Sequence, residues 1–168
     1  MMTMQLSAAA QIMQGQLQGK DTRFARVGSD TRTLQTGDLF FALSGPNFDG
    51  HDYLGIAAQQ GAIAAVVARD MDTVLPTIKV ADPLAGLGKL AAAWRQQAHA
   101  KVIGITGSNG KTTLKEMIAS ILCQEHSVLA TRGNLNNDIG MPLSLLRLQD
   151  EAYAVIEMGA NHAGEIAY

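Results

Sequence analysis

The sequence predicts an α/β protein with parallel sheets. Apolar stretches of strand length alternate along the chain with longer segments whose apolar residues recur at helical spacing. One of these alternations contains a glycine-rich loop, residues 107–110, between an apolar stretch and a helical segment. Hydrophobic residues make up 47% of the 168 residues, enough for a buried core. We expect two units, residues 1–98 and residues 99–168.

In the first unit, helices and strands are marked by their usual start and stop residues. Helices are expected at residues 6–13, 52–60 and 82–98, and strands at residues 38–43, 64–68 and 77–81. Ser7 is placed to cap the first helix, and Gly15 and Gly61 are placed to end the first two. Asp82 followed by Pro83 is a strong helix start, with the aspartate at the cap and the proline in the first turn.

The same rhythm continues in the second unit. Strands are expected at residues 101–106, 127–131 and 153–158, and helices at residues 111–124 and from Pro142 onward. Trp94 has helical spacing with nearby leucines, which favours a core position, and Cys123 has apolar neighbours, which favours burial. Only three strands follow residue 101, so we expect the chain to be the first part of a longer protein.

Composition excludes several classes of protein. The net charge is −2 and no long run of lysine or arginine occurs, so no nucleic-acid partner is expected. The single Cys123 cannot form an intramolecular disulfide. Residues 1–20 lack the layout of a signal peptide, and no apolar run reaches the roughly 18 residues needed to span a bilayer. We expect a soluble cytoplasmic monomer.

The glycine-rich loop has the sequence context of a phosphate-binding loop. The residues expected to bind ATP are Thr106, Gly107, Ser108, Asn109, Gly110, Lys111, Thr112 and Thr113. Glycines let backbone N–H groups turn toward phosphate oxygens, and the following helix adds its positive end. Lys111 is expected to reach the β- and γ-phosphates and Thr112 to ligate Mg²⁺. The general pattern has a glycine where Ile105 stands, so a glycine-rich turn before an ordinary helix is the alternative.

Glu157 is the candidate carboxylate for the metal. It lies at the end of the predicted strand 153–158, and ligands of parallel sheets bind at the carboxyl ends of strands. A carboxylate there can hold the Mg²⁺ that bridges ATP phosphates. The alternative is a solvated glutamate at the end of a strand.

A polar loop at residues 133–142 contains Asn134 and Asn137. Small polar side chains in such a loop can hydrogen-bond a ligand carboxylate or phosphate. Asparagine, aspartate and glycine also dominate ordinary turns, so a surface loop is the alternative.

Three motifs resemble one family. Residues 106–113 resemble the phosphate loop of the Mur ligases, ATP-dependent amide-bond-forming enzymes of peptidoglycan synthesis, and also that of folylpolyglutamate synthase. Residues 133–142 and 159–166 resemble the branch that adds D-alanyl-D-alanine, and the Thr-Thr-Pro typical of the branch adding the third residue is absent. Residues 30–32, 37–42 and 45–51 resemble the domain of these ligases that binds the uridine diphosphate (UDP) group.

The resemblance implies roles for further residues. Thr31, Arg32, Asn47 and Phe48 lie where UDP binds in the family, and Asn134 and Asn137 are expected to assist substrate binding. Arg32 can pair with a diphosphate, and Phe48 can pack against uracil; a surface ion pair and a core aromatic are the alternatives. By the same resemblance Glu157 is a metal ligand and, with Lys111, a catalytic residue.

The implied reaction is the MgATP-driven ligation of D-alanyl-D-alanine to UDP-N-acetylmuramoyl-tripeptide through an acyl phosphate. The parts of the family machinery expected beyond this chain include the site for the amine, so residues 1–168 alone are expected to be inactive. Two alternatives stay open. One is the ligase that adds the third peptide residue, diaminopimelate or lysine. The other is a non-enzymatic nucleotide-binding module, which the absence of an Asn-Lys-x-Asp guanine motif weakens.

Overall fold

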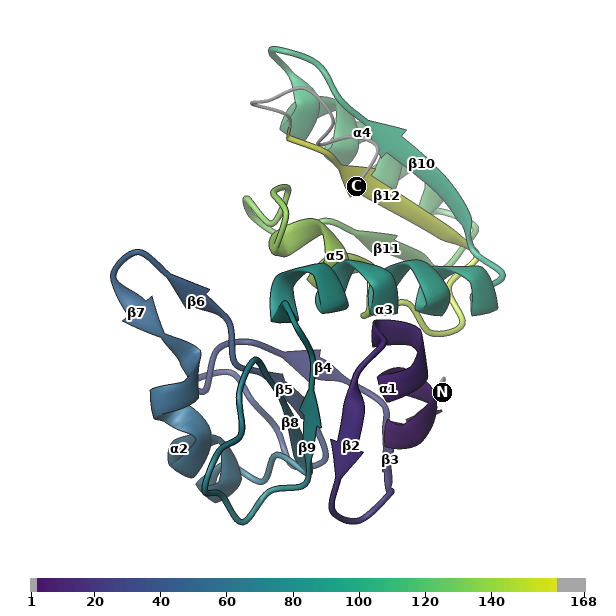
Figure 1. Ribbon diagram of the computed structural model, residues 1–168. Coiled ribbons are helices and arrows are strands. Elements are labelled where there is room, and N and C mark those ends of the chain that lie inside the picture. The colour runs from purple at the N-terminus through teal and green to yellow at the C-terminus, as the bar shows by residue number, and fades with distance from the viewer. Residues whose placement is uncertain (1–2, 160–168) are drawn as a thin grey trace. The chain divides into compact units, whose positions relative to one another are not determined.

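The computed structural model describes residues 3–159, which divide into two compact units between Leu90 and Ala91 (Figure 1). Their division falls inside helix α3 (Pro83–Gln97) and not after it, where the sequence placed it. The reason is that α3 contributes to both units. Lys89 donates a 2.9 Å hydrogen bond to Gln14 in the first unit, whereas the indole of Trp94 donates a 2.8 Å bond to the carbonyl of Leu148 in the second. No helix in the described part is long and apolar enough to cross a membrane.

The first unit is built on a five-stranded sheet in the order β2-β9-β8-β5-β4. Its strands are β2 (Gln16–Gln18), β4 (Val27–Gly28), β5 (Leu39–Phe41), β8 (Ala64–Val67) and β9 (Thr77–Lys79). The pairs from β4 to β9 are parallel, and β2 runs antiparallel to β9. Every residue of β5 and β8 is buried, so the apolar runs expected there form the core of the sheet.

Short elements surround this sheet. They are β1 (Met4–Gln5) paired with β3 (Arg23–Phe24), the antiparallel hairpin of β6 (Ser44–Gly45) and β7 (Phe48–Asp49), the 3₁₀ helix η1 (Gly50–Tyr53), and the helices α1 (Leu6–Met13) and α2 (Leu54–Gln59). Leu54 and Ala57 of α2 pack with Phe40 in one buried cluster. The hairpin therefore leads directly into the helical segment that covers the sheet.

Two of the expected helix ends are confirmed and two need correction. Gly61 follows α2 with a φ of +88°, and Asp82 accepts from the N–H groups of Leu84 and Ala85 at the start of α3. Ser7, however, lies inside the first turn of α1 and does not cap it. A partner from outside the helix satisfies this end, because Asp21 accepts from both the N–H and the hydroxyl of Ser7.

The other end of α1 also differs. The helix stops at Met13 because Gln14 adopts a left-handed conformation with a φ of +57°, so Gln14 and not Gly15 makes the turn.

The described part of the second unit is a three-stranded parallel sheet in the order β10-β12-β11. The strands are β10 (Lys101–Ile105), β11 (Val128–Ala130) and β12 (Tyr153–Glu157), and the helices are α4 (Lys111–Leu122) and α5 (Gly140–Leu145). Ile105, Ala119 of α4 and Val155 form its buried centre. Because β12 lies between the other two strands, Glu157 pairs in register with Ile105, the last residue of the strand that precedes the glycine-rich loop.

Two details of this unit differ from expectation. Helix α5 begins at Gly140, before Pro142. Cys123 is exposed, not buried, because α4 ends at Leu122 and the cysteine falls in the turn that follows. Trp94 is buried, as its helical spacing predicted.

Candidate functional site

The loop between β10 and α4 has the backbone of a phosphate-binding turn. Gly107 has a φ of +142° and Gly110 a φ of +75°, conformations that other residues rarely adopt. No atom lies within 4 Å of a Cβ built at either position, so backbone conformation and not lack of space requires glycine there. Ile105, which stands where the general pattern has glycine, is a buried core residue of β10. The departure from the pattern therefore falls in the strand and leaves the loop intact.

Lys111 is the first residue of α4 and extends back over the loop. Its ammonium donates a 2.7 Å hydrogen bond to the carbonyl of Gly107. Residues 106–110 are all exposed, and the N-terminal end of the twelve-residue α4 faces the same loop. A cation, the backbone of an exposed glycine turn and a helix N-terminus thus meet at one place, the combination that binds phosphate.

Glu157 is fixed at the end of β12 by three hydrogen bonds. Its Oε2 accepts from the hydroxyl of Thr112 at 2.9 Å, and its Oε1 accepts from the amide of Asn136 at 2.8 Å. Its backbone N–H donates to the hydroxyl of Thr131 at 2.9 Å. Only 2% of Glu157 is exposed, so the alternative of a solvated strand-end glutamate is wrong.

The residues around Glu157 fit a magnesium ion that is shared with a nucleotide. Thr112 and Glu157 bring a hydroxyl and a carboxylate together, the ligand types Mg²⁺ prefers. Among residues 3–159 there is no group of three or more His, Cys, Asp or Glu side chains able to enclose a metal. Mg²⁺ keeps several waters and takes further oxygens from substrate phosphates, so a carboxylate and a hydroxyl are a sufficient contribution from the protein.

The asparagine-rich loop contributes a residue that the sequence did not single out. Asn136 holds Glu157, whereas Asn134 is exposed and Asn137 accepts from the N–H of Gly140 at 2.8 Å, which shapes the start of α5. A role for Asn134 and Asn137 in substrate binding stays a prediction. The loop itself was predicted from its composition, but composition did not indicate which asparagine faces the carboxylate.

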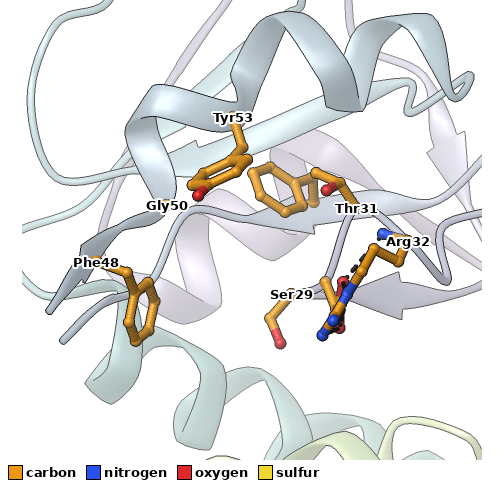
Figure 2. A pocket seen from close by; sticks show the side chains of 8 residues that line it. Ser29, Thr31, Arg32, Phe48, Gly50 and Tyr53 are labelled. Atoms are coloured by element: carbon orange, nitrogen blue, oxygen red, sulfur yellow. Dashed lines mark hydrogen bonds and ion pairs between the residues drawn. The ribbon is translucent and has the colours of Figure 1, made fainter.

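A pocket of about 480 Å³ in the first unit brings together three of the four residues expected to bind UDP (Figure 2). It is lined by Ser29, Asp30, Thr31, Arg32, Phe40, Phe48, Gly50 and Tyr53. Asn47 is exposed in the turn of the β6–β7 hairpin and does not line the pocket. Ser29 and Tyr53 were not predicted; both lie beside motifs the sequence did indicate.

The pocket presents exposed aromatic and cationic groups. Phe48 is 52% exposed and Tyr53 43% exposed, so the alternative of Phe48 as a core aromatic is wrong. In Figure 2, Phe48 lies at one side of the pocket and Arg32 at the other. Arg32 pairs with Asp30 at 2.6 Å, with 86% of its side chain exposed. The hydrogen bond from Arg32 lowers the pKa of Asp30, and Asp30 in turn raises the pKa of Arg32.

The hairpin that carries Phe48 is anchored through Asp49. The Asp49 carboxylate accepts from Arg69, from the hydroxyl of Ser44, and from both the backbone N–H and the Nδ1 of His51. The Nε2 of His51 accepts from the N–H of Ala68, which leaves the ring proton on Nδ1. The bond from Arg69, followed by those from His51 and Ser44, holds the pKa of Asp49 well below its ordinary value.

The fold and the loop define the second unit as a phosphate-loop nucleotide-binding unit of the α/β class. Two family models agree with this architecture: "Mur ligase middle domain" matches residues 105–168, and "Mur ligase family, catalytic domain" matches residues 23–95. The chain belongs to the Mur ligase family.

Relatives and solved structures agree with the family. A UDP-N-acetylmuramoyl-tripeptide–D-alanyl-D-alanine ligase from Escherichia coli K12 is 51% identical, over 100% of this chain and 37% of its own length. A crystal structure of MurF from Acinetobacter baumannii superposes with a TM-score of 0.90 at 44% identity, covering 98% of this chain and 38% of that one. A MurF ligase from Thermotoga maritima in complex with ADP gives a TM-score of 0.76 at 36% identity, covering 84% and 34%. The chain thus spans little more than a third of the length of these proteins.

The resemblance noted at residues 159–166 extends past Gly159, outside the described residues.

Proposed function

We propose that this chain is the nucleotide-binding N-terminal part of an ATP-dependent ligase that joins D-alanyl-D-alanine to UDP-N-acetylmuramoyl-tripeptide. The observation that carries the proposal is the contact of Thr112 with Glu157 at the mouth of a phosphate loop. The 51% identity to a ligase of that name supports the choice of substrates. Because the reaction consumes ATP, we propose the cytoplasm as its compartment. The expected monomeric state stays a prediction.

In this proposal the phosphate loop binds and neutralises the nucleotide. Lys111 exchanges its bond with the Gly107 carbonyl for the phosphate oxygens, which is a gain because an ionic acceptor binds an ammonium more strongly than a neutral carbonyl. The N–H groups of the loop and the N-terminus of α4 add donors that need no rearrangement.

Thr112 and Glu157 would hold the magnesium ion. Bound MgATP would supply the γ-phosphoryl group that converts the tripeptide carboxylate into an acyl phosphate and leaves ADP; attack by the amine then forms the amide bond and releases phosphate. Asn136 donates to one oxygen of Glu157 and Thr112 to the other, so these two residues orient the carboxylate that would hold the metal. Activation is needed because a free carboxylate is a poor electrophile, and the protein contributes mainly position and charge.

The pocket of the first unit is proposed to bind the uridine diphosphate group. Phe48 and Tyr53 offer exposed rings against which uracil can stack. Arg32 keeps its full charge and is almost entirely exposed, so a diphosphate can replace Asp30 as its partner. Asn134 and Asn137, which do not line this pocket, are also proposed to bind the UDP-linked substrate.

The test is phosphate release from ATP by the full-length enzyme, with each substrate supplied alone and then together. We expect release that requires UDP-N-acetylmuramoyl-tripeptide and D-alanyl-D-alanine together. Release that requires the UDP-linked dipeptide and diaminopimelate or lysine would identify the third-residue ligase instead. Nucleotide binding with no release under either condition would favour a binding module and refute the ligase.

A further inference from the structure

Lys115 is a buried cation that the proposed chemistry does not use. It lies one turn after Lys111 on α4 and is only 1% exposed. Its ammonium donates to the carbonyl of Thr131 at 2.7 Å and pairs with Glu116 at 2.8 Å, and the side chain of Glu116 is 67% exposed. Burying an ammonium is costly unless its partners compensate. Because the side chain of Glu116 is exposed, the carbonyl of Thr131 is the buried partner that stabilises the Lys115 ammonium.

Thr131 uses all three of its polar groups at the end of the sheet. Its carbonyl accepts from Lys115, its hydroxyl accepts from the N–H of Glu157, and its own N–H donates to the carbonyl of Val155. Only 2% of Thr131 is exposed, so water does not substitute for these partners. Thr131 thus links α4 to the last residues of β12.

Helix α4 consequently reaches Glu157 at two points. Thr112 contacts the carboxylate directly, and Lys115 contacts the backbone of Glu157 through Thr131. Thr112 and Lys115 are three positions apart, so they lie on the same face of the helix. One point fixes the end of the side chain and the other fixes its origin on the main chain.

We propose that Lys115 is a positioning residue, which acts through Thr131 to fix the main chain at Glu157 so that the carboxylate faces Thr112. The inference rests on the proposed MgATP site. Groups that orient a metal ligand commonly change metal affinity by roughly 10- to 100-fold when they are removed. A merely structural Lys115 would change stability and leave the magnesium requirement alone.

The first test uses two matched variants of Thr131 in the metal-free full-length enzyme. Thr131→Val keeps the shape and removes the hydroxyl, whereas Thr131→Ser keeps the hydroxyl. Hydrogen exchange measured by mass spectrometry on a peptide spanning residues 155–158 reports the Glu157 amide. We expect exchange roughly two- to tenfold faster in Thr131→Val, the range for one lost hydrogen bond, a smaller increase in Lys115→Met, which acts through Thr131, and close to the parent rate in Thr131→Ser.

The second test is calorimetric binding of ADP at increasing Mg²⁺ concentration. Thr131→Val is expected to raise, by roughly tenfold, the Mg²⁺ concentration at which the increase in ADP affinity is half-maximal. Lys115→Met is expected to raise it somewhat less because it acts through Thr131. Glu116→Gln removes the charge of the exposed partner of Lys115, and its ADP binding should depend on Mg²⁺ as that of the parent does. The double variant Lys115→Met with Thr131→Val should require no more Mg²⁺ than Thr131→Val alone, since both changes act on Glu157 through Thr131.

The outcomes separate this inference from the proposed function. A parent enzyme whose ADP binding does not depend on Mg²⁺ would refute the proposed metal site and this inference together. A parent that depends on Mg²⁺, with Thr131→Val and Lys115→Met titrating within twofold of it, would overturn the inference alone. If Lys115→Met does not fold, the Thr131 pair decides, because a Thr131→Val titration like that of Thr131→Ser would equally refute the path.

Discussion

The hydroxyl of Thr112 donates a 2.9 Å hydrogen bond to the carboxylate of Glu157, joining residues 45 positions apart in the chain. The contact exists because β12 lies between β10 and β11, which brings the end of β12 beside the end of the strand that feeds the phosphate loop. Sheet order, more than loop sequence, therefore assembles the proposed metal site.

Lys111→Ala should lower kcat of the full-length enzyme by about 10²–10³-fold, the range for losing one preorganised charge-stabilising group. Its ammonium contacts only the carbonyl of Gly107 among the described residues, so the fold should survive. Steady-state phosphate release measures the effect, and circular dichroism checks the fold. Lys20→Ala, at an exposed lysine of the first unit, is the control. Unchanged kcat in Lys111→Ala would remove the phosphate-loop assignment.

Phe48→Ala should weaken UDP binding to the full-length enzyme by about 1–3 kcal/mol, the range for a base stacked on an aromatic ring. Arg32→Ala should cost about 1.5–3 kcal/mol, because a diphosphate would lose a charged donor. Calorimetry with UDP, without ATP, measures both. Ile56→Ala is the matched control, since Ile56 is also an exposed apolar residue but does not line the pocket. If both variants bind UDP as tightly as the parent does, the nucleotide binds elsewhere.

The sequence was a good guide where structure depends on neighbouring residues. Helix α4 and strand β12 begin at the predicted residues, because the glycine-rich loop and the apolar run that define them are local signals. The sequence did not predict contacts between residues that are far apart in the chain. Asp21 satisfies the start of α1 from 14 positions away, and no local pattern indicates this.

Dependence on distant contacts also explains which residues of the candidate site the sequence could identify. Glu157 was identifiable because it ends an apolar strand, but Asn136 was not, because three asparagines of one loop have similar chemistry. Which of them faces inward depends on contacts such as the 2.7 Å bond from the N–H of Gly159 to the carbonyl of Asn136. Tyr53 was missed for a similar reason, since its exposure depends on how η1 leaves the hairpin.

Asp49 should stay ionised well below the usual range of an aspartate. Arg69, His51 and Ser44 stabilise its charged form, which lowers its pKa in the folded protein. A depressed folded pKa contributes stability that is present above the unfolded value, about 3.9, and is lost as the pH falls through the folded value. Carbon NMR of the Asp49 carboxyl should show no titration at pH 4.

Loss of the Asp49 charge should make the β6–β7 hairpin, which carries Phe48, less stable. Asp49→Asn is expected to speed hydrogen exchange of the Ala68 amide at pH 7, because His51 would lose its anionic partner while it accepts from Ala68. The acid sensitivity of that exchange between about pH 4 and pH 2 should also disappear in the variant. Equal exchange in parent and variant over this range would show that Asp49 does not anchor the hairpin.

Glu157→Gln should raise the magnesium requirement of the full-length enzyme. Glutamine has the size of glutamate and can still accept from Thr112, but it removes the buried negative charge that attracts the cation. We expect the Mg²⁺ concentration for half-maximal activity to rise and kcat to fall, by about tenfold or more because Mg²⁺ depends on carboxylate ligands. UDP binding, which we propose for the pocket of the first unit, should not change. Glu151→Gln, at a partly buried glutamate of the same unit, is the matched control. Parent-like activity of Glu157→Gln at every Mg²⁺ concentration would mean that this carboxylate only supports the loop.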